Sequence, residues 1–217
     1  MDRGLFVTFE GIEGSGKSSV AREVGEAFGR AGLPVLLARE PGGAPVPEAI
    51  RRVLLDPAHR GLSPRAELLL YLASRAQLVE EVVRPALGRG VSVLCDRFMD
   101  ASVAYQGWAR GLGEELVAEL NAFAVAGVVP DRTFVLDLPV PDGFARGPER
   151  REAEGERRRD RLELEDRDFH ERVREGYLRI ASREPGRVTV IDAAMPLEAV
   201  VGAIVRNLRA LPGLSDL

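Results

Sequence analysis

The sequence predicts an α/β fold in which helices flank both faces of a five-stranded parallel sheet, giving three layers. Strand-like and helical segments alternate along the whole chain, which is the pattern of repeated βα units. The first unit carries a glycine-rich loop between its strand and its helix. The sequence contains no internal repeat and no linker long enough to divide its 217 residues, so we expect a single domain over residues 1–217.

The individual elements follow from apolar runs and helix-start signals. Runs rich in Val, Leu, Ile and Phe predict strands at residues 5–9, 34–39, 91–95, 133–138 and 188–191. Amphipathic periodicity, with proline near the first turn of two segments, predicts helices at residues 18–28, 47–55, 64–87, 114–126, 167–182 and 197–208.

Composition excludes several classes of protein. Hydrophobic residues make up 45% and charged residues 29%, as in ordinary globular domains, and no run approaches the roughly 20 apolar residues of a membrane span. Met1 leads into no signal-peptide pattern, and the single cysteine, Cys95, excludes an internal disulfide framework. The net charge of −4 disfavours a general polyanion binder. We expect a cytoplasmic protein that binds neither nucleic acid nor membrane.

The only lysine among the thirty Lys and Arg residues lies in the glycine-rich loop. The loop reads GIEGSGKS at residues 11–18, which is the G-x-x-x-x-G-K-S pattern of a phosphate-binding P-loop. Lys17 is expected to reach the β- and γ-phosphates, while the Ser18 hydroxyl and the Asp96 carboxylate are expected to bind Mg²⁺. The predicted contacts with the triphosphate are Gly11, Ile12, Glu13, Gly14, Ser15, Gly16, Lys17, Ser18 and Ser19.

One charged segment interrupts the alternation of strands and helices. Residues 146–166 are nearly devoid of large apolar side chains, and residues 149–161 carry six arginines against five acids. One interpretation is a solvated charged helix. The other, favoured by the P-loop, is an Arg-rich lid over the transferring phosphates, which we expect at about residues 143–166.

A P-loop alone does not identify an enzyme, because G proteins, motors, transporters and small kinases share it. The guanine-reading Asn-Lys-x-Asp motif of G proteins needs a second lysine, which this sequence lacks. Motors and transporters carry coupling modules for which 217 residues leave no room. A small kinase of the nucleotide type fits this length.

Further motifs make the sequence resemble the bacterial thymidylate kinases, a family of P-loop nucleoside monophosphate kinases. The resemblance is carried by FEGIEGSGKS at residues 9–18, REPGG at 39–43, DRF at 96–98 and AYQG at 104–107. It extends through DRLE at residues 160–163, FH at 169–170 and IDA at 191–193. It implies ATP-dependent phosphorylation of dTMP to dTDP in dTTP biosynthesis, with Mg²⁺, by an enzyme that is typically a homodimer.

The resemblance also implies roles for residues of the dTMP site. Glu13 matches the carboxylate that holds the 3′-hydroxyl, and Arg97 matches the arginine on the acceptor phosphate, with Arg51 as a second candidate. Tyr71 and Arg75 lie four residues apart on one helix face and match the aromatic that stacks on thymine and the arginine that reaches a pyrimidine carbonyl. A solvent-facing loop acid, an exposed helix arginine and core packing are the alternative interpretations of Glu13, Arg51 and Tyr71.

Three more residues complete the predicted dTMP site, and the lid completes the catalytic set. Ser102 and Gln106 can satisfy the polar pyrimidine edge, and Tyr105 matches the tyrosine that crowds the 2′ position. Residues 12–15 of the P-loop offer no cation, so lid arginines are expected to stabilise the moving phosphoryl group. The predicted catalytic residues are Lys17, Arg97, Arg157, Arg158 and Arg159, with Arg161 as a further lid candidate.

Two alternative functions stay open at the level of the sequence. The first is a P-loop kinase that acts on another nucleoside or nucleoside monophosphate. The second is a nucleotide-gated binding module that hydrolyses ATP slowly or never. A phosphorylated acceptor formed together with ADP would distinguish a kinase from the second alternative.

Overall fold

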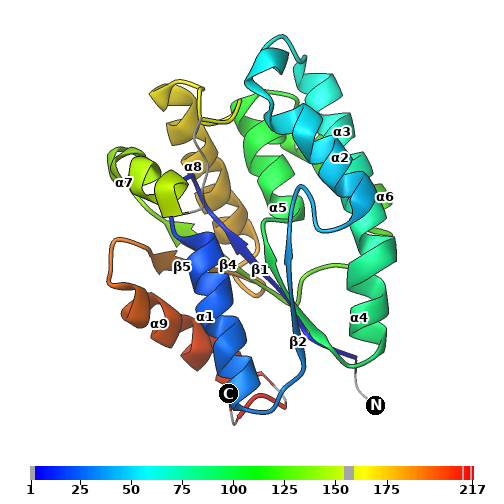
Figure 1. The fold of residues 1–217 in the computed structure, drawn as a ribbon, viewed down its shortest axis with the longest axis vertical. Coiled ribbons are helices and arrows are strands. Elements are labelled where there is room, and N and C mark those ends of the chain that lie inside the picture. The colour runs from blue at the N-terminus through cyan, green and yellow to red at the C-terminus, as the bar shows by residue number, and fades with distance from the viewer. Residues whose placement is uncertain (1–2, 154–158, 212, 216) are drawn as a thin grey trace.

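The computed structural model describes residues 3–153, 159–211, 213–215 and 217, and it shows a parallel sheet between helical layers (Figure 1). The strand order is β2-β3-β1-β4-β5, and every neighbouring pair is parallel. The predicted three-layer α/β fold is therefore confirmed. The strands are β1 Phe6–Glu10, β2 Val35–Arg39, β3 Ser92–Asp96, β4 Arg132–Asp137 and β5 Val188–Asp192.

The strand order places the carboxyl end of β1 at the point where the chain changes direction across the sheet. After β1 the chain goes to one side, to β2 and β3, and later to the other side, to β4 and β5. Phe9 is in register with Asp96, so the loops that leave β1 and β3 lie side by side. Open α/β sheets bind their ligands in the crevice at such a switch point.

Helices cover both faces of the sheet (Figure 1). The helices α1 and α9 contact each other on one side, and α3, α4 and α6 lie on the other. The helix α8 packs against β4 and β5. The α-helices are α1 Lys17–Arg30, α2 Pro45–Leu55, α3 Pro64–Leu78, α4 Arg84–Gly88, α5 Met99–Ser102, α6 Glu114–Val125, α7 Val140–Ala153, α8 Arg167–Arg183 and α9 Leu197–Arg209.

The helix predicted at residues 64–87 is not one regular α-helix. It runs as α3, a π-helical segment Val79–Val83 and then α4. Pro85 explains the change, because proline has no N–H to donate and its ring clashes with the carbonyl of the residue four positions earlier, Glu81. The π turn absorbs this clash while it keeps Val79 and Val83 buried.

Besides the 3₁₀ turn Pro57–His59, two helical segments were missing from the predicted helices, although a charged helix was one interpretation of residues 146–166, which α7 overlaps. Residues 99–109 form α5 and a π-helical segment Val103–Ala109, whose five-residue hydrogen-bond pattern obscures the usual apolar period. The helix α7 carries too few apolar side chains to show a period at all. Both segments border the candidate site described below. None of the helices in the described ranges combines the length and apolarity needed to cross a bilayer.

Candidate active site

A cavity of about 1200 Å³ opens at the carboxyl edge of the sheet. It exceeds the volume of about 300–1,000 Å³ that one small ligand usually fills, so it can hold two substrates together. Its wall joins segments that are far apart in the sequence. The predicted site residues on this wall are Glu13, Gly14, Ser15, Gly16, Lys17, Ser18, Ser19, Arg51, Tyr71, Asp96, Arg97, Ser102, Tyr105 and Gln106.

The glycines of the loop between β1 and α1 are required by its backbone. Gly11, Gly14 and Gly16 have φ of 137°, 77° and 88°, a region that L side chains rarely adopt. A Cβ on Gly11 would lie 2.5 Å from the Leu136 carbonyl oxygen, and one on Gly14 would lie 2.4 Å from that of Gly143. The loop thus folds tightly against its neighbours and leads directly into the N-terminus of α1. A helix N-terminus offers free N–H groups to an anion, so this cradle fits a phosphate chain.

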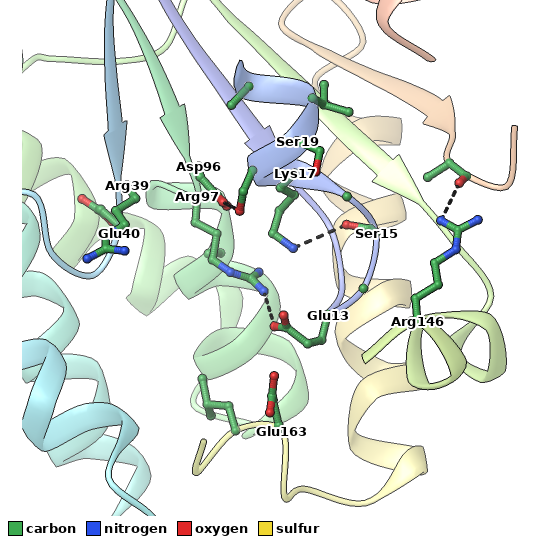
Figure 2. Close-up of a pocket in the computed structure, with 18 of the residues that line it drawn as sticks. Glu13, Ser15, Lys17, Ser19, Arg39, Glu40, Asp96, Arg97, Arg146 and Glu163 are labelled. Carbon is green, nitrogen blue, oxygen red and sulfur yellow. Dashed lines mark hydrogen bonds and ion pairs between the residues drawn. The ribbon is translucent and has the colours of Figure 1, made fainter. Parts of the chain in front are cut away.

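Lys17 lies inside the loop and is only 6% exposed (Figure 2). Its Nζ donates to the Ile12 carbonyl oxygen at 2.8 Å and to Ser15 Oγ at 3.4 Å. Burial, followed by repulsion from Arg97, lowers the pKa of Lys17 to about 8. Among the described residues, no carboxylate forms an ion pair with this ammonium, although Glu13, Asp96 and Glu10 act to raise its pKa. A bound polyanion would stabilise its charged form.

Ser18 and Asp96, the predicted metal ligands, are in contact. Ser18 Oγ donates to Asp96 Oδ2, across the gap between the start of α1 and the end of β3. Within the described ranges, no three His, Cys, Asp or Glu side chains gather as a metal cluster. Mg²⁺ usually binds one or two protein oxygens and takes its other ligands from substrate phosphates and water. A hydroxyl and a carboxylate beside a phosphate cradle fit that requirement.

Arg97 follows β3 in a left-handed conformation with φ of 68°, which is uncommon for a residue with a side chain. Its backbone N–H donates to the Phe9 carbonyl oxygen at 2.9 Å. Nη1 donates to the Gly11 carbonyl oxygen at 2.9 Å and to the Tyr177 hydroxyl at 3.2 Å. Nη2 donates to Glu13 Oε2 at 3.3 Å (Figure 2). The surrounding structure therefore stabilises a strained backbone that aims this guanidinium into the cavity.

Tyr177 contacts Arg97, and Glu10 in turn contacts Tyr177; neither was among the predicted site residues. Glu10 is fully buried, where its Oε1 accepts from the Phe98 N–H at 2.7 Å and its Oε2 accepts from the Tyr177 hydroxyl at 2.8 Å. Burial, then repulsion from Asp100, raises the pKa of Glu10 to about 8. The sequence did contain a signal for Glu10, because it is an acidic residue at the end of the buried strand β1, where the chain reaches the switch point.

Tyr71, Ser102, Tyr105 and Gln106 form the opposite part of the wall. Tyr71 comes from α3, whereas the other three come from α5 and the adjoining π-helical segment. The helical stretch at residues 99–109, which was not predicted, therefore carries three of the four residues. The Arg97 guanidinium lies 5.2 Å from the centre of the Tyr105 ring. Burial raises the pKa of Tyr105 to about 12, so its phenol stays neutral.

Arg75 lies behind the wall and does not line the cavity; it is 1% exposed. Nε and Nη2 donate to Glu40 Oε2 at 2.9 and 2.7 Å. Nη1 donates to Ser102 Oγ at 3.0 Å and to Asn121 Oδ1 at 2.5 Å, and Nη2 also donates to the Phe98 carbonyl oxygen at 3.0 Å. A pyrimidine carbonyl would have to replace one of these acceptors, so the expected direct contact stays a prediction.

The lid arginines have different placements. Arg157 and Arg158 lie outside the described residues, whereas Arg159 is exposed and is not part of the cavity wall. Arg161 is not free to reach phosphate, because it is 3% exposed and its Nε donates to the Leu54 carbonyl oxygen at 2.7 Å.

Arg146 of α7 is the described arginine of this region that lines the cavity. Its Nη1 donates to the Ala193 carbonyl oxygen at 3.0 Å (Figure 2). Arg51 of α2 also lines the cavity, and its Nη1 donates to the Pro41 carbonyl oxygen at 2.9 Å. Each guanidinium keeps further N–H groups with which to meet an anion.

Comparison with known proteins agrees with these motifs and this geometry. Residues 9–204 match the family model described as Thymidylate kinase. The chain belongs to the thymidylate kinase family. It is 50% identical over 200 residues to a thymidylate kinase of Trichlorobacter lovleyi, with 92% of this chain and 94% of that protein covered. It is 49% identical over 197 residues to one of Pseudomonas fluorescens, with 91% of each covered.

A solved structure in the thymidylate kinase family extends the likeness to three dimensions. The crystal structure of thymidylate kinase from Ehrlichia chaffeensis superposes with a TM-score of 0.73 at 30% identity. The match covers 95% of this chain and 99% of that one. The resemblance inferred from the motifs is thus confirmed for the family and for the fold.

Proposed function

We propose that this cavity transfers the γ-phosphoryl group of ATP to dTMP, giving ADP and dTDP for dTTP synthesis. Membership of the thymidylate kinase family supports the reaction. The observation that carries the assignment to this site is that one cavity joins the P-loop to a wall built by Tyr71, Ser102 and Gln106. A donor phosphate chain and an acceptor base can therefore be held at the same time.

On the donor side, the P-loop backbone and Lys17 hold the phosphate chain. Lys17 exchanges its contact with the Ile12 carbonyl for phosphate oxygens, which restores the stability of its charged form. Ser18 and Asp96 would hold Mg²⁺, and the ion would supply positive charge against the charge that develops in phosphoryl transfer. The hydrogen bond between Ser18 and Asp96 supports this assignment, because it brings the two oxygens together beside the P-loop.

On the acceptor side, Arg97 and Arg51 bind the dTMP phosphate, and Glu13 accepts a hydrogen bond from the 3′-hydroxyl. Guanidinium groups offset the repulsion between acceptor and donor phosphates and hold them in line. In the structure Glu13 accepts from Arg97, so a substrate exchanges that pairing for contacts with both residues. Tyr71 stacks on the pyrimidine, and Tyr105 limits space at the 2′ position.

The arginines of the lid supply cations that the P-loop lacks. Residues 12–15 carry no positive side chain, yet the moving phosphoryl group needs positive charge around it. Arg146 already lines the cavity, and Arg159 stands at the end of the described part of the lid. We assign this role to the lid as a group, with Arg157 and Arg158 among the candidates.

A homodimer is also proposed, through α3 and α6. Leu69 on α3 and Leu116 and Phe123 on α6 are 61%, 51% and 87% exposed, and the two helices pack side by side. Exposed apolar groups of this size on adjacent helices indicate an interface, and most homo-oligomers are two-fold dimers. A Phe123→Asp variant should shift the mass measured by light scattering from dimer to monomer, whereas an unchanged dimer would place the interface elsewhere.

The reaction is proposed to take place in the cytoplasm, without nucleic acid or membrane as a partner. The net charge of −4 and the single cysteine support this placement. Cell fractionation with an activity assay would test it.

The proposed acceptor is tested by measuring ADP release and product formation across dTMP, dUMP, dCMP, AMP and thymidine. We expect dTMP to give one dTDP for each ADP and to have the highest kcat/KM. Preferential phosphorylation of another acceptor would replace dTMP as the substrate. ADP formed without any phosphorylated acceptor would leave a nucleotide-gated module as the function.

A further inference from the structure

Glu67 is a fully buried acid of α3 that no step of the mechanism above uses. Its Oε1 accepts from Gln106 Nε2 at 2.8 Å, and its Oε2 accepts from Arg110 Nη2 at 3.2 Å. Arg161 Nη1 lies 2.5 Å from the same Oε2. Glu67 lies four residues before Tyr71, and Tyr71 lies four residues before Arg75. The three residues therefore lie along one face of α3.

Two guanidinium groups, those of Arg110 and Arg161, contact this carboxylate, and a carboxylate oxygen paired in this way accepts hydrogen bonds and donates none. Gln106 must therefore turn its amide nitrogen toward Glu67, since its oxygen has nothing to accept there. The Gln106 amide oxygen is left for the cavity, which Gln106 lines.

An amide oxygen whose orientation is fixed, in the part of the cavity proposed to hold the pyrimidine, selects among pyrimidines. It accepts from a ring N–H, which thymine and uracil carry at N3. Cytosine has a lone pair at N3, so two acceptors would face each other and both would lose a hydrogen bond. A rotatable amide would adapt to either base by turning over.

We propose that Glu67 is a positioning residue that sets base specificity: it locks the Gln106 amide so that the site accepts a pyrimidine with N3–H and rejects cytosine. The inference rests on the proposed function, because it requires the pyrimidine of a nucleoside monophosphate to lie against Gln106. Arg161 lies within the predicted lid, residues 143–166, and pairs with Glu67, while its backbone N–H donates to the Leu55 carbonyl oxygen of α2 at 2.9 Å. The cavity wall at Gln106 and the lid segment at Arg161 thus contact the same buried carboxylate, that of Glu67.

The test replaces Glu67 by Gln, whose side chain can either donate or accept. The kcat/KM is measured for dTMP, dUMP and dCMP in the wild type, Glu67→Gln, Gln106→Leu and the double variant. We expect Glu67→Gln to lower the dTMP/dCMP preference at least tenfold and to leave dTMP/dUMP unchanged, because both of these bases carry N3–H. The double variant should show no further loss of preference beyond Gln106→Leu, because Glu67 acts through Gln106.

A matched control is Glu114→Gln, which removes a carboxylate that also pairs with two arginines, Arg179 and Arg183, outside the cavity. It should leave both ratios unchanged. Glu67→Asp keeps an acceptor-only side chain, so it should retain the dTMP/dCMP preference even where the rate falls. If Glu67→Gln fails to fold, Gln106→Leu decides the question, since an unchanged dTMP/dCMP preference in that variant would overturn the proposal.

An equal loss of kcat/KM for all three acceptors in Glu67→Gln would also overturn the proposal, because it would show a purely structural ion pair. The wild-type measurement separates this failure from failure of the proposed function. If the wild type forms dTDP from dTMP, the function stands whatever Glu67 does. If it forms no dTDP, the function itself is wrong.

Discussion

The two halves of the cavity are built in different ways. The phosphate cradle of the proposed donor half is one continuous stretch, in which Lys17 contacts Ile12 and Ser15 only a few residues away, and Asp96 joins it from the end of β3. The acceptor half joins residues from distant segments, such as Gln106 to Glu67 and Arg97 to Tyr177. The first half depends on local backbone geometry, whereas the second depends on long-range contacts between charged and polar groups.

We expect this difference to separate the determinants of phosphate binding from those of acceptor choice. A loop defined by glycines and one ammonium can bind the same phosphate chain in many proteins. An acceptor site held by buried hydrogen bonds discriminates strongly, because a wrong ligand leaves polar groups unpaired. Changes in the donor half should therefore abolish turnover for every acceptor, and changes in the acceptor half should alter affinity and choice.

The largest effect is expected for Lys17→Ala. Removing the ammonium should lower kcat by about 10³-fold for every acceptor, because a buried cation at the developing charge is lost. Steady-state ADP release measures the rate, and circular dichroism checks that the fold is kept. Lys17→Arg should also be strongly impaired, since the guanidinium fork does not fit the buried space of the ammonium. Near-normal turnover in either variant would contradict the assigned role of the P-loop.

Arg97→Met is the corresponding change in the acceptor half. It should lower kcat/KM for dTMP by about 100-fold, mainly through KM, while KM for ATP changes little. Initial rates at varied dTMP and at varied ATP separate these effects. Arg84→Met, which removes an exposed arginine paired with Glu80, should leave both constants unchanged. An equal rise in both KM values would show that Arg97 does not belong to the acceptor half alone.

Single alanine substitutions of the lid arginines Arg146, Arg157, Arg158 and Arg159 should have smaller effects. At least one of them should lower kcat by about tenfold, equivalent to about 1.4 kcal/mol of transition-state stabilisation. Single-turnover measurements would show that the chemical step is slowed. If none of the four variants slows the reaction, the lid does not supply the missing cation.

The smallest effect concerns the support of Arg97 by Glu10. The pKa of Glu10 is raised to about 8 in the folded protein from an ordinary value of 4.5, so the folded state keeps a proton that the unfolded chain releases between these values. Stability should therefore fall as pH rises through this window, with a contribution of up to about 1.4 kcal/mol per pH unit. Glu10→Gln should remove this contribution.

Urea unfolding of both proteins at pH 5.5 and at pH 7.5 measures the difference. The wild type should lose more stability than Glu10→Gln over this interval. Parallel pH dependence of the two proteins would show that Glu10 is already ionised in the folded state.

The sequence was sufficient for the parts of the molecule that rest on local rules. The five strands, the P-loop and the proximity of Ser18 and Asp96 could be predicted, because strand period, glycine spacing and strand-end position determine them. The π-helical segment that carries Gln106 could not, because its irregular period hides it.

Contacts across long sequence separations were the second limit. Nothing local to Arg75 reveals that Glu40, Ser102 and Asn121 engage its guanidinium behind the wall. The contact between Glu67 and Gln106, on which the proposed role of Glu67 rests, likewise forms only once α3 and the π-helical segment lie together. The helical spacing from Glu67 to Tyr71 was the one signal in the sequence that pointed to it.

The most direct test of the account follows the γ-phosphoryl group itself. Purified protein is incubated with Mg²⁺, dTMP and ATP labelled in the γ-phosphate, and the products are separated by chromatography. The account predicts that the label leaves ATP and appears in the β-phosphate of dTDP, one for each ADP formed. Label recovered as inorganic phosphate, with dTMP unchanged, would contradict it.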